Sequence, residues 1–231
     1  IYIAGELGGM GLIRNAITQG RLAIEKIAED PRATGSDEYD VVIIGAGPAG
    51  FSSSLASMEK GLRYLTLEQD TFGGTVAHYA RGKLVMTAPA QLPLYGTMDK
   101  GEISKENLME FWEGVRKKTH VQIQFSQRVT AIKPETNGFT VETETAKHRT
   151  RHVVLAIGRR GTPRKLEVKG EEMTKVVYRL IEPDQYVGKK VLVVGGGDSA
   201  IEAAISIAAE RDTDVTLSYR SEALSRIKPG N

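Results

Sequence analysis

The sequence predicts an α/β fold in two parts, a doubly wound parallel sheet with a small β-meander followed by a second, partial unit of similar construction. Residues 41–44 are continuously β-branched, which is typical of a strand buried on both faces of a parallel sheet. A glycine-rich turn, a helical stretch and a second strand at residues 64–67 follow this run. The same order of elements recurs over residues 191–217. Two units of strand, helix and strand therefore predict parallel sheets with helices packed on them.

Composition and charge narrow the class of protein. The chain has 231 residues, of which 40% are hydrophobic and 26% charged, the composition of a globular protein with a buried core. Its 31 basic and 29 acidic residues give a net charge of +2, so neither a nucleic-acid nor a membrane partner is expected. The chain has no cysteine, which excludes disulfides, thiolate metal sites and iron–sulfur clusters. Because no signal peptide and no apolar run of ~18 residues is present, we expect a cytoplasmic location.

The chain divides into four segments. Residues 1–30 predict a strand and a helix, since their apolar residues after the strand recur at helical spacing. Residues 31–38 form a charged linker that contains a proline. Residues 39–160 and 161–231 then carry the first and the second glycine-rich unit. The second unit has only two strands, too few to bury both faces of a sheet, so we expect the chain to be part of a longer protein.

Further elements are predicted between the two glycine-rich units. Ser104 is a suitable N-cap for a helix whose apolar residues, including Trp112, share one buried face. The dipeptide Asn137-Gly138 predicts a hairpin turn between two short strands. Residues 153–157 predict another buried strand, which ends before Gly158.

The first glycine-rich turn, residues 45–50, has the spacing G-x-G-x-x-G between a strand and a helix. This spacing allows a tight turn, a close approach of the backbone to a pyrophosphate and close packing of helix on strand. Glu68 follows the next strand, roughly 20 residues after the glycines. At this separation in the sequence, a carboxylate binds the ribose hydroxyls of a dinucleotide. The candidate residues for this dinucleotide are Gly45, Gly47, Pro48, Ala49, Gly50, Glu68 and its neighbour Gln69.

The second glycine-rich turn, residues 195–200, has alanine at the third glycine position, which is an accepted variant. The strand after it ends in Arg220 instead of an acid, and a guanidinium pairs with the 2′-phosphate that distinguishes NADPH from NADH. Glu222 is the alternative, as a displaced ribose acceptor, and Arg220 and Arg226 are alternatively solvated surface charges. The candidate residues for NADPH are Gly195, Gly197, Asp198, Ser199, Arg220 and Arg226.

One chain thus carries two unlike dinucleotide loops, one with an acid and one with an arginine. This combination indicates a flavoprotein that takes hydride from a nicotinamide cofactor. The predicted fold is therefore a doubly wound FAD-binding domain of Rossmann type with a β-meander, joined to a truncated Rossmann-type NADPH-binding domain.

These motifs together resemble the flavoproteins with two dinucleotide-binding domains, the class II pyridine nucleotide-disulfide oxidoreductases, and within them the thioredoxin reductase-like branch. Residues 41–50 and 195–202 are similar to the FAD and NADPH loops of this family, and residues 153–158 to the motif where its chain leaves the FAD domain. The resemblance covers nearly the whole chain. It implies further contacts with FAD at Gly73, Gly74, Thr75, Val129 and Gly158.

The opening segment also resembles a family motif, but in a different place. Residues 1–7 with the following helix are similar to the C-terminal FAD motif, whose acid and helix start approach the flavin and its ribityl chain. Glu6 stands where the family has aspartate. In the family this motif follows the NADPH domain, whereas here it precedes the FAD loop. The segment is then the tail of an upstream module, the interpretation that we favour, or a rearranged part of its own fold, or a motif supplied to a partner copy.

A second departure concerns the chemistry. Thioredoxin reductases place a Cys-x-x-Cys just ahead of the NADPH loop, and the corresponding residues 176–183 contain no thiol. Thioredoxin reduction by the family mechanism is therefore excluded. The branch without these cysteines includes ferredoxin–NADP reductase-like and bacillithiol disulfide reductase-like enzymes, and the chain is similar in outline to both.

The sequence therefore predicts an FAD-dependent oxidoreductase that accepts hydride from NADPH and passes electrons to a small-molecule or protein acceptor. No side chain is predicted to be a catalytic acid or base, and no metal site is predicted. His120, His148 and His152 lack metal-ligand spacing and are expected at the surface. The family resemblance implies a homodimer. The alternatives are a redox-sensing or electron-transfer module of a larger protein, a flavin monooxygenase, and a structural remnant whose FAD site does not close.

Overall fold

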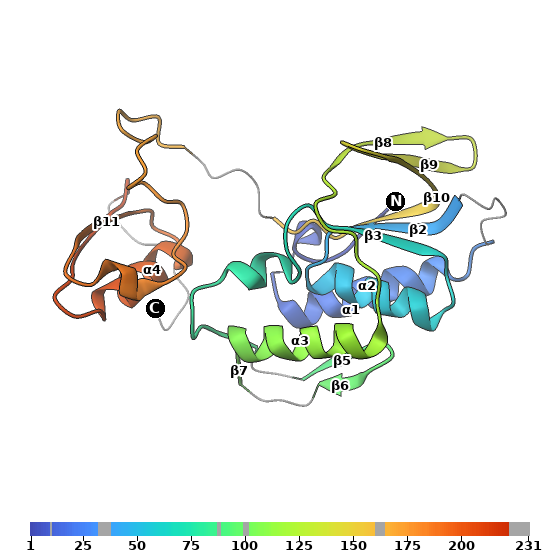
Figure 1. Ribbon diagram of the computed structural model, residues 1–231, viewed down its shortest axis with the longest axis horizontal. Helices are drawn as coiled ribbons and strands as arrows, with labels where there is room; N and C mark the ends of the chain where they lie inside the picture. The colour runs from blue at the N-terminus through green and yellow to red at the C-terminus, as the bar shows by residue number, and fades with distance from the viewer. Residues whose placement is uncertain (10, 32–37, 87–88, 99–101, 160–164, 222–231) are drawn as a thin grey trace. The chain divides into compact units, whose positions relative to one another are not determined.

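The structure is a computed structural model that describes residues 1–9, 11–31, 38–86, 89–98, 102–159 and 165–221. The chain folds into two compact units (Figure 1). The first comprises Ile1–His78 and Gly82–Thr162, and the second comprises Tyr79–Arg81 and Pro163–Asn231. The predicted boundary between residues 160 and 161 and most of the predicted linker 31–38 lie outside the described residues.

The first unit is built on a six-stranded mixed sheet. In sheet order the strands are β3 (Tyr64–Leu67), β2 (Glu38–Ile44), β10 (Lys147–Leu155), β9 (Gly138–Thr143) and β8 (Val129–Glu135), with β1 (Tyr2–Ile3) paired to β10. Strands β1, β10, β2 and β3 are parallel to one another, whereas β9 is antiparallel to both β10 and β8. The parallel part is the Rossmann-type sheet, and the β8–β9–β10 part is the β-meander that the sequence predicts.

Strand β10 has two different neighbours along one of its edges. Residues 147–150 pair with β9, and Val154 and Leu155 pair with Tyr2 and Ile3 of β1. The opposite edge of β10 pairs with β2 over nearly its whole length. The second half of β10 therefore lies between two parallel strands, and one of them comes from the opening segment of the chain.

Helices α1 (Ile13–Ile27) and α2 (Pro48–Glu59) pack against each other beside the sheet (Figure 1). Alternate residues of β2 point to opposite faces, because successive side chains of a strand alternate. Val41 and Ile43 join the core beneath α1 and α2, and Val42 and Ile44 pack with Val141 on the other face. The continuous apolar run predicted for β2 is thus explained by burial on both faces.

Helix α3 (Lys105–Thr119) follows the N-cap that the sequence predicts. The Ser104 side chain accepts a hydrogen bond from the Asn107 N–H at 3.3 Å. Trp112 is fully buried, as predicted, and its ring centroid lies 6.3 Å from that of Phe51 at the start of α2. The smaller elements of this unit are η1 (Glu6–Gly8), η2 (Gly74–His78), β4 (Leu84–Met86), β5 (Ala90–Leu92), β6 (Gly96–Met98) and β7 (Ile103–Ser104).

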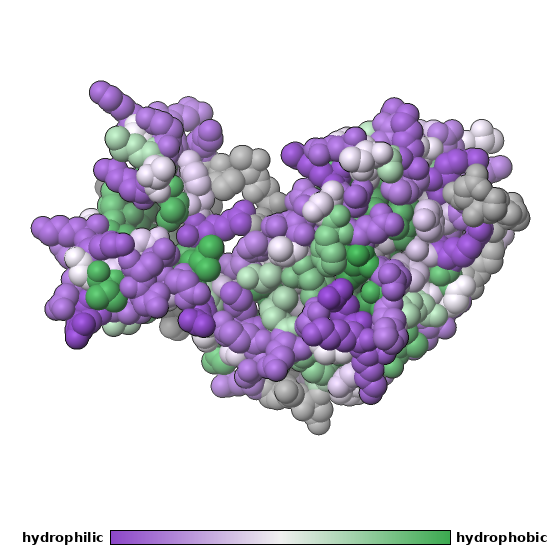
Figure 2. Space-filling view, in the orientation of Figure 1, coloured by the Kyte–Doolittle hydropathy of each residue, from purple (hydrophilic) through white to green (hydrophobic). Residues whose placement is uncertain are grey.

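The second unit contains the predicted strand–helix–strand motif. Its elements are η3 (Pro183–Tyr186), β11 (Lys190–Val194), α4 (Asp198–Ala208) and β12 (Asp214–Ser218), with β11 and β12 parallel. Val191 and Val193 are half-buried, whereas Leu192 and Val194 are exposed. Figure 2 shows hydrophobic side chains on the surface of this unit.

The structure differs from our preferred interpretation of residues 1–30 as the tail of an upstream module. These residues lie in the same compact unit as the first glycine-rich loop. The physical reason is that β10 offers the edge at Val154 and Leu155 to β1, while α2 offers a buried face to α1. Of the three possibilities, the structure has the segment completing its own fold.

Candidate functional site

The first glycine-rich loop joins β2 to α2 at the carboxyl end of the parallel strands. Gly45 has a φ of +104°, in the left-handed region, and a Cβ on it would lie 2.5 Å from the carbonyl oxygen of Ala156. A Cβ on Gly50 would overlap the carbonyl oxygen of Gly45. Both positions therefore require glycine, for the turn and for the packing of helix on strand.

Glu68 holds this loop from the end of the neighbouring strand, β3. Its side chain is buried, and Oε2 accepts a hydrogen bond from the Ala46 N–H at 2.7 Å. Its other oxygen, Oε1, accepts a hydrogen bond from the Asp70 N–H at 2.8 Å. A carboxylate has about four acceptor positions, so capacity remains for further donors such as ribose hydroxyls. The contact with Ala46 could not be predicted, because a main-chain donor leaves no trace in the pattern of side chains.

Residues 73–75 lie directly beside the first loop. The Gly73 N–H donates to the carbonyl oxygen of Ala46 at 3.0 Å. A Cβ on Gly74 would lie 3.0 Å from the Cα of Gly47. The glycine pair and the loop therefore approach each other through their backbones.

Three further residues predicted to contact FAD have fewer contacts with the first loop, or none. Gly158 follows β10 with a φ of +64°, and a Cβ on it would lie 3.9 Å from Oγ1 of Thr75. Val129 is the half-buried first residue of β8, in register with Thr143. Gln69 is exposed. The structure thus brings Gly158 to the loop region and leaves the side chain of Gln69 at the surface.

The opening segment places Glu6 at the same end of the sheet. The Ala4 N–H donates to the Leu155 carbonyl oxygen at 3.0 Å, and Gly5 and Glu6 follow directly. Glu6 is half-buried, and its Oε1 lies 3.0 Å from the position that a Cβ on Gly11 would take. The carboxylate of Glu6 therefore lies close to the backbone that leads into α1.

The first loop has the donors that a dinucleotide pyrophosphate requires. Pro48 and Ala49 open α2, and among the described residues no side chain caps the helix at Gly47. The free N–H groups of a helix start, at the positive end of its dipole, bind phosphate. A Cβ on Gly47 would meet only atoms of residues 73–74, at 3.8 and 3.9 Å. The arrangement of donors, acid and glycines therefore fits FAD.

The second glycine-rich loop joins β11 to α4. The Gly195 N–H donates to the Ser218 carbonyl oxygen at 2.9 Å, which ties the loop to β12. Gly197 is the residue before α4, and Asp198 and Ser199 form the first turn of this helix. The loop therefore has the strand–turn–helix geometry of a nucleotide-binding turn.

Of the two arginines predicted to bind NADPH after β12, the structure describes only the first. Arg220 follows β12 and is exposed. Arg226 lies outside the described residues. A Cβ on Gly196 would overlap the ring of Tyr219, so this ring covers part of the loop. Sequence reasoning did not identify Tyr219, whose only signal is its place directly ahead of Arg220.

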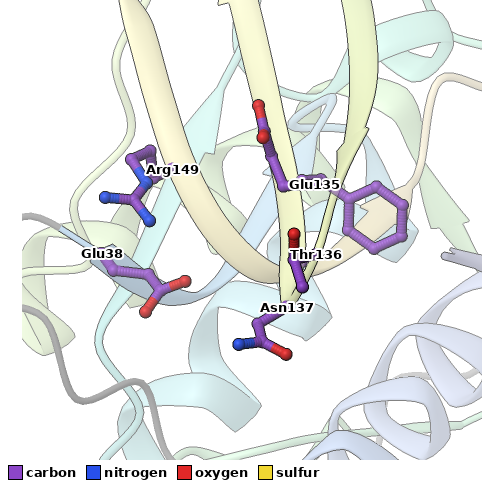
Figure 3. A pocket seen from close by; sticks show the side chains of 7 residues that line it. Glu38, Glu135, Thr136, Asn137 and Arg149 are labelled. Atoms are coloured by element: carbon purple, nitrogen blue, oxygen red, sulfur yellow. The ribbon is translucent and has the colours of Figure 1, made fainter.

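A small pocket in the first unit lies away from these loops (Figure 3). It is formed where β2 begins and where the β8–β9 hairpin turns, between the side chains of Glu38, Glu135 and Arg149. The glycine-rich loop follows the opposite, carboxyl end of β2, where open α/β sheets bind their ligands. This pocket is therefore separate from the candidate FAD site.

Two of the three histidines expected at the surface are not there. His120 is exposed, as predicted, but His148 and His152 are half-buried on β10. Desolvation is the main cause that lowers the pKa of each. The Nε2 of His152 also lies 3.5 Å from a carboxylate oxygen of Asp30, which raises its pKa in part. The prediction was wrong because β10 begins six residues earlier than the apolar run from which it was predicted.

Among the described residues, no cluster of three or more His, Cys, Asp or Glu side chains is suited to a metal ion. None of the helices in the described part of the chain has the length and apolarity to cross a membrane.

Comparison with known proteins gives the family. Residues 42–230 match the pyridine nucleotide-disulphide oxidoreductase family. A ferredoxin–NADP reductase of Streptococcus gordonii is 30% identical over 190 residues, which cover 81% of this chain and 56% of that protein. The chain thus spans little more than half the length of this curated relative.

Solved structures show the same relationship. Bacillithiol disulfide reductase from Staphylococcus aureus has a TM-score of 0.72 at 25% identity, over 84% of this chain and 61% of that one. Thioredoxin reductase from Lactococcus lactis has a TM-score of 0.63 at 27% identity, over 83% and 59%. Members of this family are FAD- and NADPH-dependent reductases with Rossmann-type domains. The chain belongs to the pyridine nucleotide-disulphide oxidoreductase family.

Proposed function

We propose that this chain binds FAD at residues 45–50 and NADPH at residues 195–200, and that it transfers electrons from NADPH to an external acceptor. The observation that carries the proposal is the buried carboxylate of Glu68, bound to the Ala46 N–H within the first loop. This contact supports the proposal, because a dinucleotide requires a ribose acceptor beside the groups that bind its pyrophosphate.

Each part of the first site has a distinct role in this proposal. The N–H groups of Ala49 and Gly50 at the start of α2 bind the pyrophosphate of FAD. Glu68 binds the ribose hydroxyls, and residues 73–75 with Gly158 border the flavin. FAD, when bound, supplies the redox chemistry by accepting hydride from a nicotinamide and releasing electrons to an acceptor. The protein positions the cofactors and excludes water around them.

The second site discriminates between nicotinamide cofactors. The start of α4, with Asp198 and Ser199, binds the pyrophosphate of NADPH. Arg220, exposed after β12, pairs with the 2′-phosphate. Arg226 remains a second candidate for this phosphate. An acid at the end of β12 would repel the phosphate, so the proposal specifies NADPH over NADH.

The acceptor is external to the chain. Without a cysteine, the chain has no internal disulfide to reduce. Relatives are named for ferredoxin and for bacillithiol disulfide, one a protein and the other a small molecule. A small-molecule or protein acceptor, a cytoplasmic location and a homodimer are part of the proposal.

The visible absorption spectrum of the purified chain tests the proposal. We expect a flavin band that loses intensity faster with anaerobic NADPH than with NADH. Equal rates with both would contradict the role of Arg220. A flavin band that neither nucleotide reduces would favour an electron-transfer module of a larger protein. No flavin band, even after FAD is added, would exclude the FAD site and favour a structural remnant.

A further inference from the structure

The strongest feature outside the cofactor contacts is the interface between α1 and α2. Gly20 of α1 lies so close to α2 that a Cβ on it would overlap the carbonyl oxygen of Ala49. A Cβ at this position would also lie 3.0 Å from Oγ of Ser53. The two helices therefore meet through backbone at the first turn of α2, and only glycine at position 20 permits this distance.

Hydroxyl groups of α2 complete this contact. The Ser52 hydroxyl donates to the carbonyl oxygen of Ile17 at 2.8 Å, and the Ser53 hydroxyl donates to that of Gly20 at 3.1 Å. Both serines have 0% exposure. A buried hydroxyl without a hydrogen-bond partner is costly. Without α1, the hydroxyls of Ser52 and Ser53 would lose the carbonyl oxygens that accept their hydrogen bonds.

The turn after β1 also contacts the first turn of α2. A Cβ on Gly5 would lie 3.1 Å from Cβ of Ala49. The Gly5 N–H donates to Oε1 of Gln19 at 2.8 Å, and Gly5 has a φ of +85°. Gln19 therefore holds the turn after β1 against the helix that carries Gly20. Ala49 is thus approached by both the turn after β1 and the middle of α1.

Ala49 is also part of the proposed pyrophosphate-binding turn. Its carbonyl oxygen faces α1, and its N–H belongs to the start of α2. A displacement of this turn would therefore change the docking of the segment and the positions of the phosphate donors together. Two binding events that depend on one rigid element are coupled, and the coupling acts equally in both directions.

We propose that residues 1–27 cover the first glycine-rich loop within their own chain, and that their docking is coupled to FAD binding through the first turn of α2. The docking itself is independent of the proposed function, whereas the coupling to FAD rests on it.

The test uses the whole chain and two matched glycine-to-alanine variants. Gly20→Ala places a Cβ against the Ala49 carbonyl, and Gly114→Ala adds a Cβ to exposed α3 with nothing within 4 Å. Amide hydrogen exchange without FAD measures docking, and titration with FAD measures affinity. We expect Gly20→Ala to lose protection over residues 1–27 and to bind FAD roughly tenfold more weakly, a typical coupling, while Gly114→Ala matches the wild type.

A milder variant keeps the test informative if Gly20→Ala does not fold. Ser53→Ala removes one hydroxyl donor without adding volume, and we expect a smaller loss of both protection and FAD affinity. Unchanged protection and affinity in Gly20→Ala would overturn the proposal. Lost protection with unchanged FAD affinity would overturn the coupling.

The wild-type protein separates the remaining possibilities. If it binds no FAD, the proposed function fails, and hydrogen exchange in the glycine variants still decides whether the segment docks. Light scattering after gel filtration, over a range of concentrations, distinguishes docking within one chain from exchange between copies. Protection of residues 1–27 that is lost on dilution to monomer would overturn docking within one chain.

Discussion

At the residue scale, the first loop depends on main-chain groups held by a few buried partners. Ala46 is the centre of these contacts, since its N–H donates to Glu68 and its carbonyl accepts from Gly73. The sequence predicts Glu68 and the glycine pair, but not Ala46. An alanine between two glycines has no distinctive side chain, and its role lies entirely in its backbone.

Removal of the Glu68 carboxylate is expected to weaken both folding and FAD binding. Glu68→Ala leaves the buried Ala46 N–H without its acceptor, which costs about 1–3 kcal/mol in the free energy of unfolding. Urea denaturation and FAD titration measure the two effects. Glu110→Ala, on the exposed side of α3, is the matched control and is expected to change neither. Equal stability of the two variants would contradict this role.

The two half-buried histidines are expected to make stability depend on pH. Burial lowers the pKa of His148 and His152 below 6.5 in the folded state, so the unfolded chain binds more protons in this range. The free energy of unfolding therefore decreases as the pH falls through about 6.5 and below. The double variant His148→Gln/His152→Gln should show a weaker decrease in urea denaturation between about pH 7.5 and 5. Identical pH profiles would rule out this effect.

At the element scale, most of the parallel sheet could be predicted, but the ends of strands could not. Strand β3 occupies the predicted residues 64–67, and the predicted hairpin forms, but its two turn residues are Thr136 and Asn137 instead of Asn137 and Gly138. Strand β10 begins at Lys147, earlier than predicted. The early start could not be predicted, because the first half of the strand consists of polar residues and lacks a continuous apolar run. The pairing of β1 with β10 also could not be predicted, since the two strands are distant in the sequence.

Replacement by alanine is expected to have opposite effects on stability at two glycines, Gly50 in α2 and Gly114 in α3. Gly50→Ala would drive a Cβ into the carbonyl oxygen of Gly45, so we expect a loss of about 3 kcal/mol or more in the free energy of unfolding. Gly114→Ala, at an exposed position of α3, removes a flexible residue from a helix and should add about 0.5–1 kcal/mol to the free energy of unfolding. Chemical denaturation measures both, and a Gly50→Ala protein as stable as the wild type would contradict the close approach.

At the scale of the whole molecule, the sequence predicts two successive glycine-rich units, and the opening segment lies in the same compact unit as the first of them. The glycine loops determine the units, because each loop requires a strand before it and a helix after it. The order of motifs suggested an upstream module for residues 1–30. In the structure, α1 packs closely on α2 through Gly20 and the buried serines, so the segment lies in the first unit. Such packing can be recognised only in three dimensions.

A substitution in the second unit should be detected at the flavin of the first. Arg220→Ala removes a charge-assisted hydrogen bond to the 2′-phosphate, worth about 1.5–3 kcal/mol, or roughly ten- to a hundredfold in NADPH affinity. The rate of flavin reduction at low NADPH should fall accordingly, while the rate with NADH is unchanged. Arg211→Ala, an exposed arginine of the same unit, serves as the control. An equal fall with both nucleotides would assign Arg220 a structural role instead.

The pairing of Tyr2 with Val154 has a consequence for how the chain is made. The ribosome synthesises residues in order, so the first strand is released about 150 residues before its partner on β10 exists. At about 5–20 residues per second, that interval lasts roughly 8–30 s. Throughout it, β1 has no strand to pair with, although α2 and β2, on which α1 packs, are synthesised before β10. Strand β1 therefore takes its place in the sheet only after the last strand of that sheet has been made.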